Sequence, residues 1–352
     1  MQTSRYNFVF GLAVGLMLSF LLACFSSLSS FKMNIHKTSD SLRSFLDSRS
    51  IMQVTGQTED MHDLIDRNLG PVKPIMIEDK HFHHDNDTAA RELHKSIRVL
   101  CWIMTGPQNL DTKAIHVKKT WAKRCNVLIF ISSTTNTSFP TVGLNISEGR
   151  EHLTGKTMQA FKYVYEHYKD QAEWFMKADD DTYVILENLR YFLKDYKPSD
   201  PVYFGHHFKT IVKQGYYSGG AGYVLSKEAL TRLVVRGKDP KLCRQDGGAE
   251  DAELGKCMEN LGVRTANSTD ALGRSRFHCF DPETHLFGGY PDWYYNYDAN
   301  GAKQGTESIS DYAISFHYVP PQKMYALEFY IYHLRPYGIE TGHQDLNVHG
   351  SH

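Results

Sequence analysis

Residues 174–193, WFMKADDDTYVILENLRYFL, decide the fold class of this 352-residue chain. A short apolar run leads into three consecutive carboxylates, Asp179, Asp180 and Asp181, and a helical pattern follows them. Three adjacent like charges repel one another, and no lysine follows closely enough to neutralise all three. A buried strand that ends in this way predicts either a bound cation or a solvated turn.

The pattern on both sides of this stretch predicts an α/β fold. Predicted strands cover residues 97–104, 126–132, 172–178 and 201–205, and predicted helices cover 111–121, a segment through 161–168, and 186–193. Such alternation is typical of an open, mainly parallel sheet with helices on its faces. Ligands of these sheets bind beyond the carboxyl ends of the strands, which is where the acidic triplet stands.

The N-terminal quarter of the chain has a different character. Residues 8–25 carry no charge and as a helix would span about 27 Å, nearly the thickness of a bilayer core. We expect a cytoplasmic tail at 1–7, a transmembrane signal-anchor at 8–25, a lumenal stem at 26–93, a catalytic domain at 94–340 and a tail at 341–352. A cleaved signal peptide is the alternative, but its apolar region is usually about 7–15 residues long.

Glycosylation sequons and cysteines indicate the compartment of the folded body. Sequons begin at Asn86, Asn136, Asn145 and Asn267, all C-terminal to the predicted span, and together they favour a lumenal location. Five cysteines follow the span, so an oxidising lumen predicts two disulfides and one leftover thiol, with the pairing open. The net charge of −1 gives no basic field, so nucleic acid is not an expected partner.

The acidic triplet suits a hard divalent cation. An extended chain places Asp179 and Asp181 on one side and Asp180 on the other, and oxygen ligands select ions such as Mg²⁺ or Mn²⁺. An EF-hand is excluded because Val184 replaces the required glycine and Arg190 the bidentate glutamate. Neither a P-loop nor a GxGxxG motif is present.

Three further segments carry candidate chemistry. The segment 214–226 contains Gly219, Gly220 and Gly222. These glycines would let the backbone pass close to a ligand, or they form a hairpin that feeds a helix. Glu250 and Asp251 open a helical pattern, where acids commonly complement the helix dipole. His317 ends a strand-like stretch, and a single histidine is usually a core or surface residue.

Seven segments in order resemble the core 1 β1,3-galactosyltransferase family (glycoprotein-N-acetylgalactosamine 3-β-galactosyltransferases): CWIMTGPQNL, HVKKTWAKRCN, WFMKADDDTYVILENLRYFL, VKQGYYSGGAGYVLSKEAL, AEDAELGKC, SFHYV and YHLRPYG. The resemblance runs from about residue 97 to 338. It implies a type-A glycosyltransferase fold, in which one Rossmann-like mixed sheet is flanked by helices, on a single-pass type II Golgi membrane protein with a lumenal catalytic domain. It also implies an inverting enzyme that moves galactose from UDP-galactose to the 3-hydroxyl of GalNAc α-linked to Ser or Thr of glycoproteins.

The resemblance further implies roles for individual residues. Mn²⁺, in preference to Mg²⁺, would be bound by Asp181, His317 and Asp179. The general base would be Asp251, with Glu250 as the competing choice. The donor UDP-sugar would contact Asp179, Asp180, Gly219, Gly220 and Gly222. The acceptor sugar would stack on or contact Trp293, Tyr294, Tyr295 and Tyr217. The implied disulfides are Cys101–Cys125 and Cys243–Cys257.

The chain also departs from the family pattern. Ser308 and Ile309 stand where vertebrate-type members have two cysteines, segment 289–301 is shorter, and His206-His207 replaces common arginines. These changes leave the sugar specificity open, so a paralogue that uses another UDP-sugar, such as UDP-glucuronic acid or UDP-N-acetylglucosamine, is one alternative.

A non-catalytic lumenal chaperone of such an enzyme is the other alternative, because the family includes such a relative. The intact acidic triplet, Asp251 and His317 argue against it, since a chaperone has no need of a site for a metal and a diphosphate. By likeness to the family, the expected partners also include a second copy of the chain and a dedicated chaperone.

Overall fold

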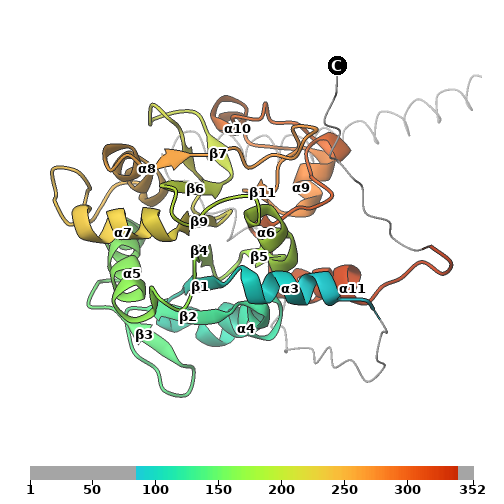
Figure 1. Cartoon of the computed structure of the whole chain (residues 1–352), viewed down its shortest axis with the longest axis horizontal. Coiled ribbons are helices and arrows are strands. Elements are labelled where there is room, and N and C mark those ends of the chain that lie inside the picture. Colours follow the sequence, from blue (N-terminus) through green and yellow to red (C-terminus); the bar gives the residue numbers. More distant parts are fainter. Residues whose placement is uncertain (1–84, 340–352) are drawn as a thin grey trace, which may run out of the picture. The chain divides into compact units, whose positions relative to one another are not determined.

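The computed structural model describes residues 85–339 (Figure 1). No helix within this range is long and apolar enough to cross a membrane. The predicted cytoplasmic tail, the predicted span at 8–25, most of the predicted stem and the C-terminal tail lie outside the described residues.

A seven-stranded sheet of order β10-β6-β9-β4-β1-β2-β3 forms the centre of the described domain. Its strands are β1 (Val99–Met104), β2 (Val127–Ser132), β3 (Thr141–Gly143), β4 (Trp174–Asp179), β6 (Val202–Gly205), β9 (Tyr223–Ser226) and β10 (Arg264–Thr265). β9 runs antiparallel to β4 and to β6, and the other pairings in this sheet are parallel. The predicted α/β class with one main mixed sheet is therefore confirmed.

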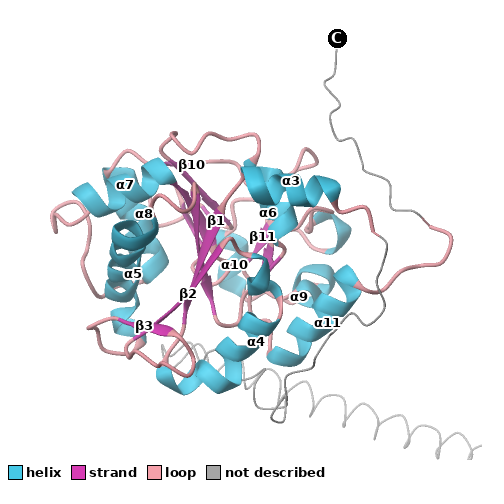
Figure 2. Ribbon diagram, turned by 60° about the horizontal axis from the view of Figure 1, so that its bottom comes forward, coloured by secondary structure: helices cyan, strands magenta, loops and turns pink. Residues whose placement is uncertain are grey.

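Helices cover both faces of this sheet (Figure 2). One face carries α5 (Leu153–Tyr168), α7 (Lys227–Arg236) and α8 (Glu250–Asn260), and the other carries α4 (Ile115–Lys119), α6 (Leu186–Leu193) and α11 (Pro321–Tyr332). Strand β1 shows why both faces need a cover, because all six of its residues are buried. Val99 and Ile103 pack into one core, while Trp102 packs into the other, edge-on to Phe161 of α5 at 5.1 Å. A parallel strand buried on both faces reads as a continuous apolar run.

Smaller elements complete the domain. Three short strands, β5 (Tyr183–Val184), β11 (Phe277–His278) and β12 (Ser315–Phe316), form a second sheet, and β7 (His207–Phe208) pairs with β8 (Tyr216–Tyr217). The remaining helices are α3 (Thr88–Ser96), α9 (Pro282–Phe287) and α10 (Asp292–Tyr297), with short 3₁₀ turns at Pro107–Asn109, Arg150–His152 and Gly305–Glu307.

The helix predicted for residues 111–121 is confirmed in part, because the region is helical but does not form one continuous α-helix. A π-helical turn (Leu110–Ala114), α4 and a 3₁₀ turn (Trp121–Arg124) share that region. Thr120 interrupts the helix with φ −106° and ψ −113°, and its hydroxyl donates to the His116 carbonyl at 2.7 Å. A threonine that bonds back to the preceding turn competes with continued helix.

The folded domain begins before residue 94, within the range predicted as stem. Helix α3 covers Thr88–Ser96, and Leu93 packs against the core. The His94 carbonyl accepts a hydrogen bond from Asn126 Nδ2 at 3.0 Å. These contacts attach the end of α3 to the residue that precedes β2.

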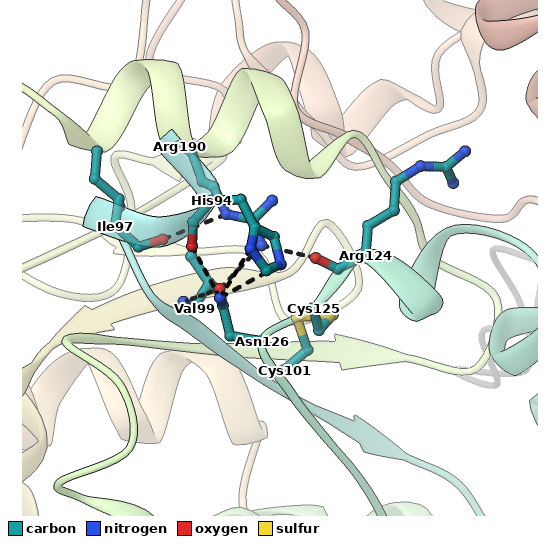
Figure 3. Close-up of a disulfide and its surroundings, with 8 residues drawn as sticks. All are labelled: His94, Ile97, Val99, Cys101, Arg124, Cys125, Asn126 and Arg190. Carbon is teal, nitrogen blue, oxygen red and sulfur yellow. Dashed lines mark hydrogen bonds between the residues drawn. A yellow bond between two sulfur atoms is a disulfide. The ribbon is translucent and has the colours of Figure 1, made fainter. Parts of the chain in front are cut away.

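Both predicted disulfides are present. Cys101–Cys125 ties β1 to the start of β2, with Cα atoms 6.1 Å apart (Figure 3). Beside it, the buried guanidinium of Arg190 donates to three oxygens, those of Ile97, Arg124 and Asn126. Cys243–Cys257 ties the segment after α7 to α8. Within residues 85–339 the free thiol is the buried Cys279, so the expected leftover cysteine is also confirmed.

Candidate active site

The three carboxylates of the acidic triplet take different partners at the end of β4. Asp180 Oδ2 accepts hydrogen bonds from Thr105 Oγ1 at 2.7 Å and Asn109 Nδ2 at 3.0 Å, both just beyond the carboxyl end of β1. Burial and the charge of Asp181 raise the pKa of Asp180 to about 7. Asp180 thus has partners of its own, apart from Asp179 and Asp181. The extended chain predicted for residues 179–181 is wrong, because β4 ends at Asp179 and the next two residues form a turn in which the Thr182 N–H donates to the Asp179 carbonyl at 3.1 Å.

Asp179, Asp181 and His317 form a cluster of candidate metal ligands. One ligand atom from each residue lies within 4.8 Å of the other two. His317 follows β12, and β12 pairs with β5, which begins two residues after Asp181. The His317 Nε2 lies 3.4 Å from Asp181 Oδ1. Burial opposes the charge of both groups, but their mutual attraction holds the pKa of Asp181 below and that of His317 above its ordinary value. The second sheet therefore brings together ligands that are remote in sequence.

This cluster fits a divalent cation. Two carboxylates and one imidazole are ligand types that Mn²⁺ accepts. His317 Nδ1 lies 3.3 Å from the Cys279 carbonyl, an outer contact that orients a ligating imidazole and leaves Nε2 toward Asp181. A Cβ atom on Gly220 would come within 2.0–2.3 Å of the His317 ring. A side chain at that position would displace the ring from the carboxylates.

The loop that contains Gly219 and Gly220 joins these ligands to the acidic start of α8. The Gly219 N–H donates to Asp251 Oδ2 at 3.2 Å, and the next residue, Gly220, packs against His317. Three successive carbonyls of this loop accept hydrogen bonds from side chains. Lys177 of β4 donates to Gly219, Thr182 donates to Gly220, and Ser315 of β12 donates to Ala221. These bonds fix the loop between the candidate metal ligands and the candidate base Asp251.

The glycines of this loop approach protein side chains closely. A Cβ on Gly219 would lie 2.7 Å from Glu250 Oε2, and one on Gly222 would lie 2.9 Å from Met176 Cε. Gly222 also has a φ of +75°, in the region that favours glycine. These packing needs explain the glycines within the protein itself, and their contact with a donor sugar stays a prediction.

Glu250 and Asp251 occupy different environments at the start of α8. Glu250 is buried, and its Oε1 accepts hydrogen bonds from Thr157 Oγ1 at 2.7 Å and Tyr223 Oη at 2.6 Å. Asp251 is half-buried and accepts backbone N–H groups, including that of Gly219. Burial and the charge of Glu250 raise the pKa of Asp251 to about 6. A carboxylate with a near-neutral pKa is suited to general base catalysis, so the geometry favours Asp251 and assigns Glu250 to the core.

The four aromatic residues predicted to bind the acceptor are not equally accessible. Tyr217 is 1% exposed and donates to the Ala266 carbonyl at 2.5 Å. Tyr294 is 2% exposed and stacks on His206. Trp293 and Tyr295 are 43% and 52% exposed. Protein atoms cover the rings of Tyr217 and Tyr294, so these two residues offer no open face to a sugar, whereas Trp293 and Tyr295 do.

Two of the residues that depart from the family pattern, His206 and Ser308, lie in the interior. His206 is buried, with Nδ1 2.8 Å from the Phe277 carbonyl and Nε2 3.3 Å from Asp298. Ser308 is buried and its Oγ lies 3.1 Å from His285 Nδ1.

A cavity of about 260 Å³ lies beyond β6 and β10 and is lined by Gly205, His206, His207, Thr265, Ala266, Asn267, Ser268, Thr269, Ser275, Arg276, Phe277 and Asn300.

The predicted glycosylation sites lie at the surface of the domain. Asn86, Asn145 and Asn267 are exposed, and Asn136 is half-buried. Their modification stays a prediction.

Lys177 is the principal site residue that the sequence reasoning missed. No lysine follows the triplet closely, but Lys177 precedes it, and its Nζ lies 2.6 Å from Asp179 Oδ1. The feature of the sequence that could have identified it is a lysine inside the otherwise apolar strand 174–178. Lysine is almost never fully buried unless it is paired, so a lysine in that pattern predicts a buried acidic partner.

Comparisons with known proteins bear on the same region. A family model described as Fringe-like matches residues 99–278. The chain is 49% identical over 269 residues to glycoprotein-N-acetylgalactosamine 3-beta-galactosyltransferase 1 of Xenopus laevis, covering 75% of this chain and 74% of that protein. It is 34% identical over 155 residues to beta-1,3-glucosyltransferase of Mus musculus, covering 43% of this chain and 31% of that protein. Among solved structures, mouse xyloside xylosyltransferase 1 in its apo form is 11% identical and covers 63% of this chain and 96% of that chain, with a TM-score of 0.35.

Proposed function

The chain belongs to the family of glycoprotein-N-acetylgalactosamine 3-beta-galactosyltransferases and is a glycosyltransferase, and from that premise we propose that it transfers galactose from UDP-galactose to the 3-hydroxyl of GalNAc α-linked to Ser or Thr of glycoproteins. The product would be the core 1 O-glycan. One observation carries the proposal. Two successive glycines contact the candidate base and a candidate metal ligand, because Gly219 bonds to Asp251 and Gly220 packs against His317.

Asp251 acts as the general base in the proposed reaction. It takes the proton from the acceptor 3-hydroxyl while that oxygen attacks C1 of galactose and the bond from C1 to the UDP oxygen breaks. Attack opposite the leaving group inverts the configuration at C1. With a pKa of about 6, Asp251 is mostly ionised at pH 7 and is a stronger base than an ordinary aspartate.

We propose Mn²⁺ as the cation that Asp179, Asp181 and His317 hold. When bound, it would offset the charge that develops on the departing diphosphate. The chain's own contacts keep two of the three ligands in place: Lys177 pairs with Asp179, and the Cys279 carbonyl orients His317.

The fold and location that we propose follow the family. The mixed sheet with its acidic triplet at the end of β4 supports a type-A glycosyltransferase fold. Two disulfides and three exposed sequons support a lumenal domain, and the apolar segment 8–25 supports a single-pass type II Golgi protein. The exposed Trp293 and Tyr295 would provide flat faces for the acceptor sugar.

A panel of donors tests the proposal. The purified full-length chain is incubated with a GalNAc-peptide and UDP-galactose, UDP-N-acetylglucosamine or UDP-glucuronic acid, with Mn²⁺ or with a chelator. We expect a β1,3-linked galactosyl product from UDP-galactose, and only with the metal. Transfer of a different sugar would favour the paralogue hypothesis, and transfer that persists after exhaustive chelation would refute the metal site. Absence of transfer from every donor would return the chaperone hypothesis to consideration.

A further inference from the structure

Lys177 is a buried cation among acidic groups from separate segments of the chain. It is 2% exposed, and its Nζ lies 2.6 Å from Asp179 Oδ1. The negative charges of Glu250 and Asp251 also act on it. Removing an ammonium group from water is costly unless it gains charge partners and hydrogen bonds, and Lys177 has both.

The contacts of Lys177 form a path across the candidate site. Its Nζ pairs with Asp179 and also donates to the Gly219 carbonyl at 3.0 Å. The N–H of the same glycine donates to Asp251 Oδ2 at 3.2 Å. Lys177 therefore contacts a candidate metal ligand directly and is separated from the candidate base by one residue.

We propose that Lys177 is a positioning residue that fixes the metal-binding carboxylate of Asp179 and the base Asp251 relative to each other through Gly219. The inference rests on the proposed function, because it assigns those roles to the two aspartates. It predicts that loss of the Lys177 ammonium group impairs both UDP binding and the chemical step, since each depends on one end of the path. A merely structural lysine would affect stability without this pattern.

Lys156 provides a matched control within the same domain. It is also 2% exposed, and its Nζ likewise bonds to one carbonyl, that of Thr105 at 2.7 Å, and to one carboxylate, that of Glu148 at 2.8 Å. Substitution of Lys156 by Met therefore removes a buried lysine with the same types of partner but leaves the path through Gly219 intact. Lys156 bonds to the backbone carbonyl of Thr105 and not to the Thr105 hydroxyl, which donates to Asp180.

The test compares Lys177→Met, Lys177→Arg and Lys156→Met in the full-length chain. The measurements are the melting temperature, the UDP affinity by calorimetry with Mn²⁺, kcat, and KM for the GalNAc-peptide. For Lys177→Met we expect a loss of about 100-fold in kcat, the scale for misplaced catalytic groups, and about tenfold in UDP affinity, the scale for loss of an outer-shell contact to a metal ligand. KM for the acceptor should stay within about threefold, because the path contains no acceptor contact.

The other two variants separate positioning from stability. Lys177→Arg keeps the charge and the donors, so it should recover at least about tenfold of the kcat lost in Lys177→Met. Lys156→Met should lower the melting temperature while kcat of the folded protein stays within about threefold of the wild type. If Lys177→Met does not fold, it is combined with Glu250→Gln, which removes one of the acids left without its counter-charge, and kcat of the double variant is compared with that of Glu250→Gln alone.

Three outcomes would overturn the inference. The first is wild-type kcat in a folded variant that lacks the Lys177 ammonium group. The second is a loss of kcat in Lys156→Met as large as that in Lys177→Met, and the third is an unchanged UDP affinity in Lys177→Met. Failure of the proposed function is a separate result. If the wild type transfers no sugar from any donor, the proposed reaction fails, and the UDP affinities of wild type and Lys177→Met still decide whether Lys177 supports Asp179.

Discussion

The pH dependence of a Glu250→Gln variant tests the assignment of Asp251 as the base. Both hydroxyls that contact the Glu250 side chain, those of Thr157 and Tyr223, donate to the same oxygen, Oε1. A glutamine has a carbonyl oxygen that can accept both, so the substitution removes a negative charge and retains these contacts. Its main effect should be on the pKa of Asp251, which the charge of Glu250 helps to raise.

The expected magnitude follows from a pKa of about 6 for Asp251 in the wild type. A base must be ionised to act, so activity is present above this pKa and is lost as the pH falls through it. At pH 7 about nine-tenths of Asp251 is ionised and at pH 5 about one-eleventh, so kcat/KM should fall about tenfold between these values. An ordinary aspartate, with a pKa of about 3.9, would lose less than about a tenth of its activity.

Removal of the Glu250 charge should lower the pKa of Asp251. The pH below which kcat/KM falls, the acid limb of the pH profile, should therefore move to a lower value. Burial is the larger cause of the raised pKa and Glu250 the second, so we expect the limb to move by less than about one pH unit. At pH 5, relative to pH 7, the variant should then retain up to about fivefold more activity than the wild type. Charged or titratable groups that also act on or near Asp251 are Lys177, Tyr203 and Tyr216, and they are the same in both proteins.

The assay is kcat/KM for a GalNAc-peptide between pH 5 and pH 8, at saturating UDP-galactose and Mn²⁺. UDP affinity is measured at each pH as a control, because protonation of His317 would compete with metal binding. A limb that moves to higher pH in Glu250→Gln would refute the electrostatic reasoning. A loss of 100-fold or more at the pH optimum would instead identify Glu250 as the base.

Three further variants give independent checks. Asp251→Asn should lower kcat by about 10²–10⁴-fold while calorimetry finds an unchanged UDP affinity, and unchanged kcat would remove Asp251 from the mechanism. Gly220→Ala should displace the His317 ring, which its Cβ would approach within 2.0–2.3 Å, so metal-dependent UDP binding should be lost in a protein that still melts cooperatively. If binding is retained, the ring is not confined as described. Cys243→Ser opens the disulfide to Cys257, with a sequence separation of 14, and should lower the free energy of unfolding by about 3 kcal/mol in denaturant titrations; a loss under about 1 kcal/mol would contradict this estimate.

The large elements of the fold are predictable from the sequence because they bury continuous apolar runs. The strands β1, β2 and β4 stand within two residues of their predicted ranges, and α6 has the predicted bounds of residues 186–193. The small elements are not predictable in this way. Strands of two residues, such as β5 and β12, are too short to show a period and form only because tertiary contacts pair them.

The site is predictable to the extent that local geometry determines it. Alternation along an extended chain predicts that Asp179 and Asp181 lie close together. They do, but a turn at residues 180–181 brings them together, and the alternating pattern does not show that turn. The approach of His317 depends on the pairing of β5 with β12, which no local pattern encodes, so the resemblance to a family was needed to suggest it. Burial is likewise a property of the fold. It separates Tyr294, which is covered, from Tyr295, which is exposed, although they are adjacent aromatic residues.

Three consecutive aspartates can coexist at the end of β4 because each carboxylate contacts a different polar or charged side chain. Asp179 pairs with Lys177 and Asp181 with His317, while Asp180 bonds to neutral groups and has a pKa of about 7. Lys177 and His317 thus already lie beside Asp179 and Asp181 before any ligand binds. A nucleotide diphosphate would add further negative charge at this point, and a divalent cation can interact with the carboxylates and the diphosphate oxygens at once. The run of acids is therefore compatible with a stable fold, and its need for a metal arises when the donor binds.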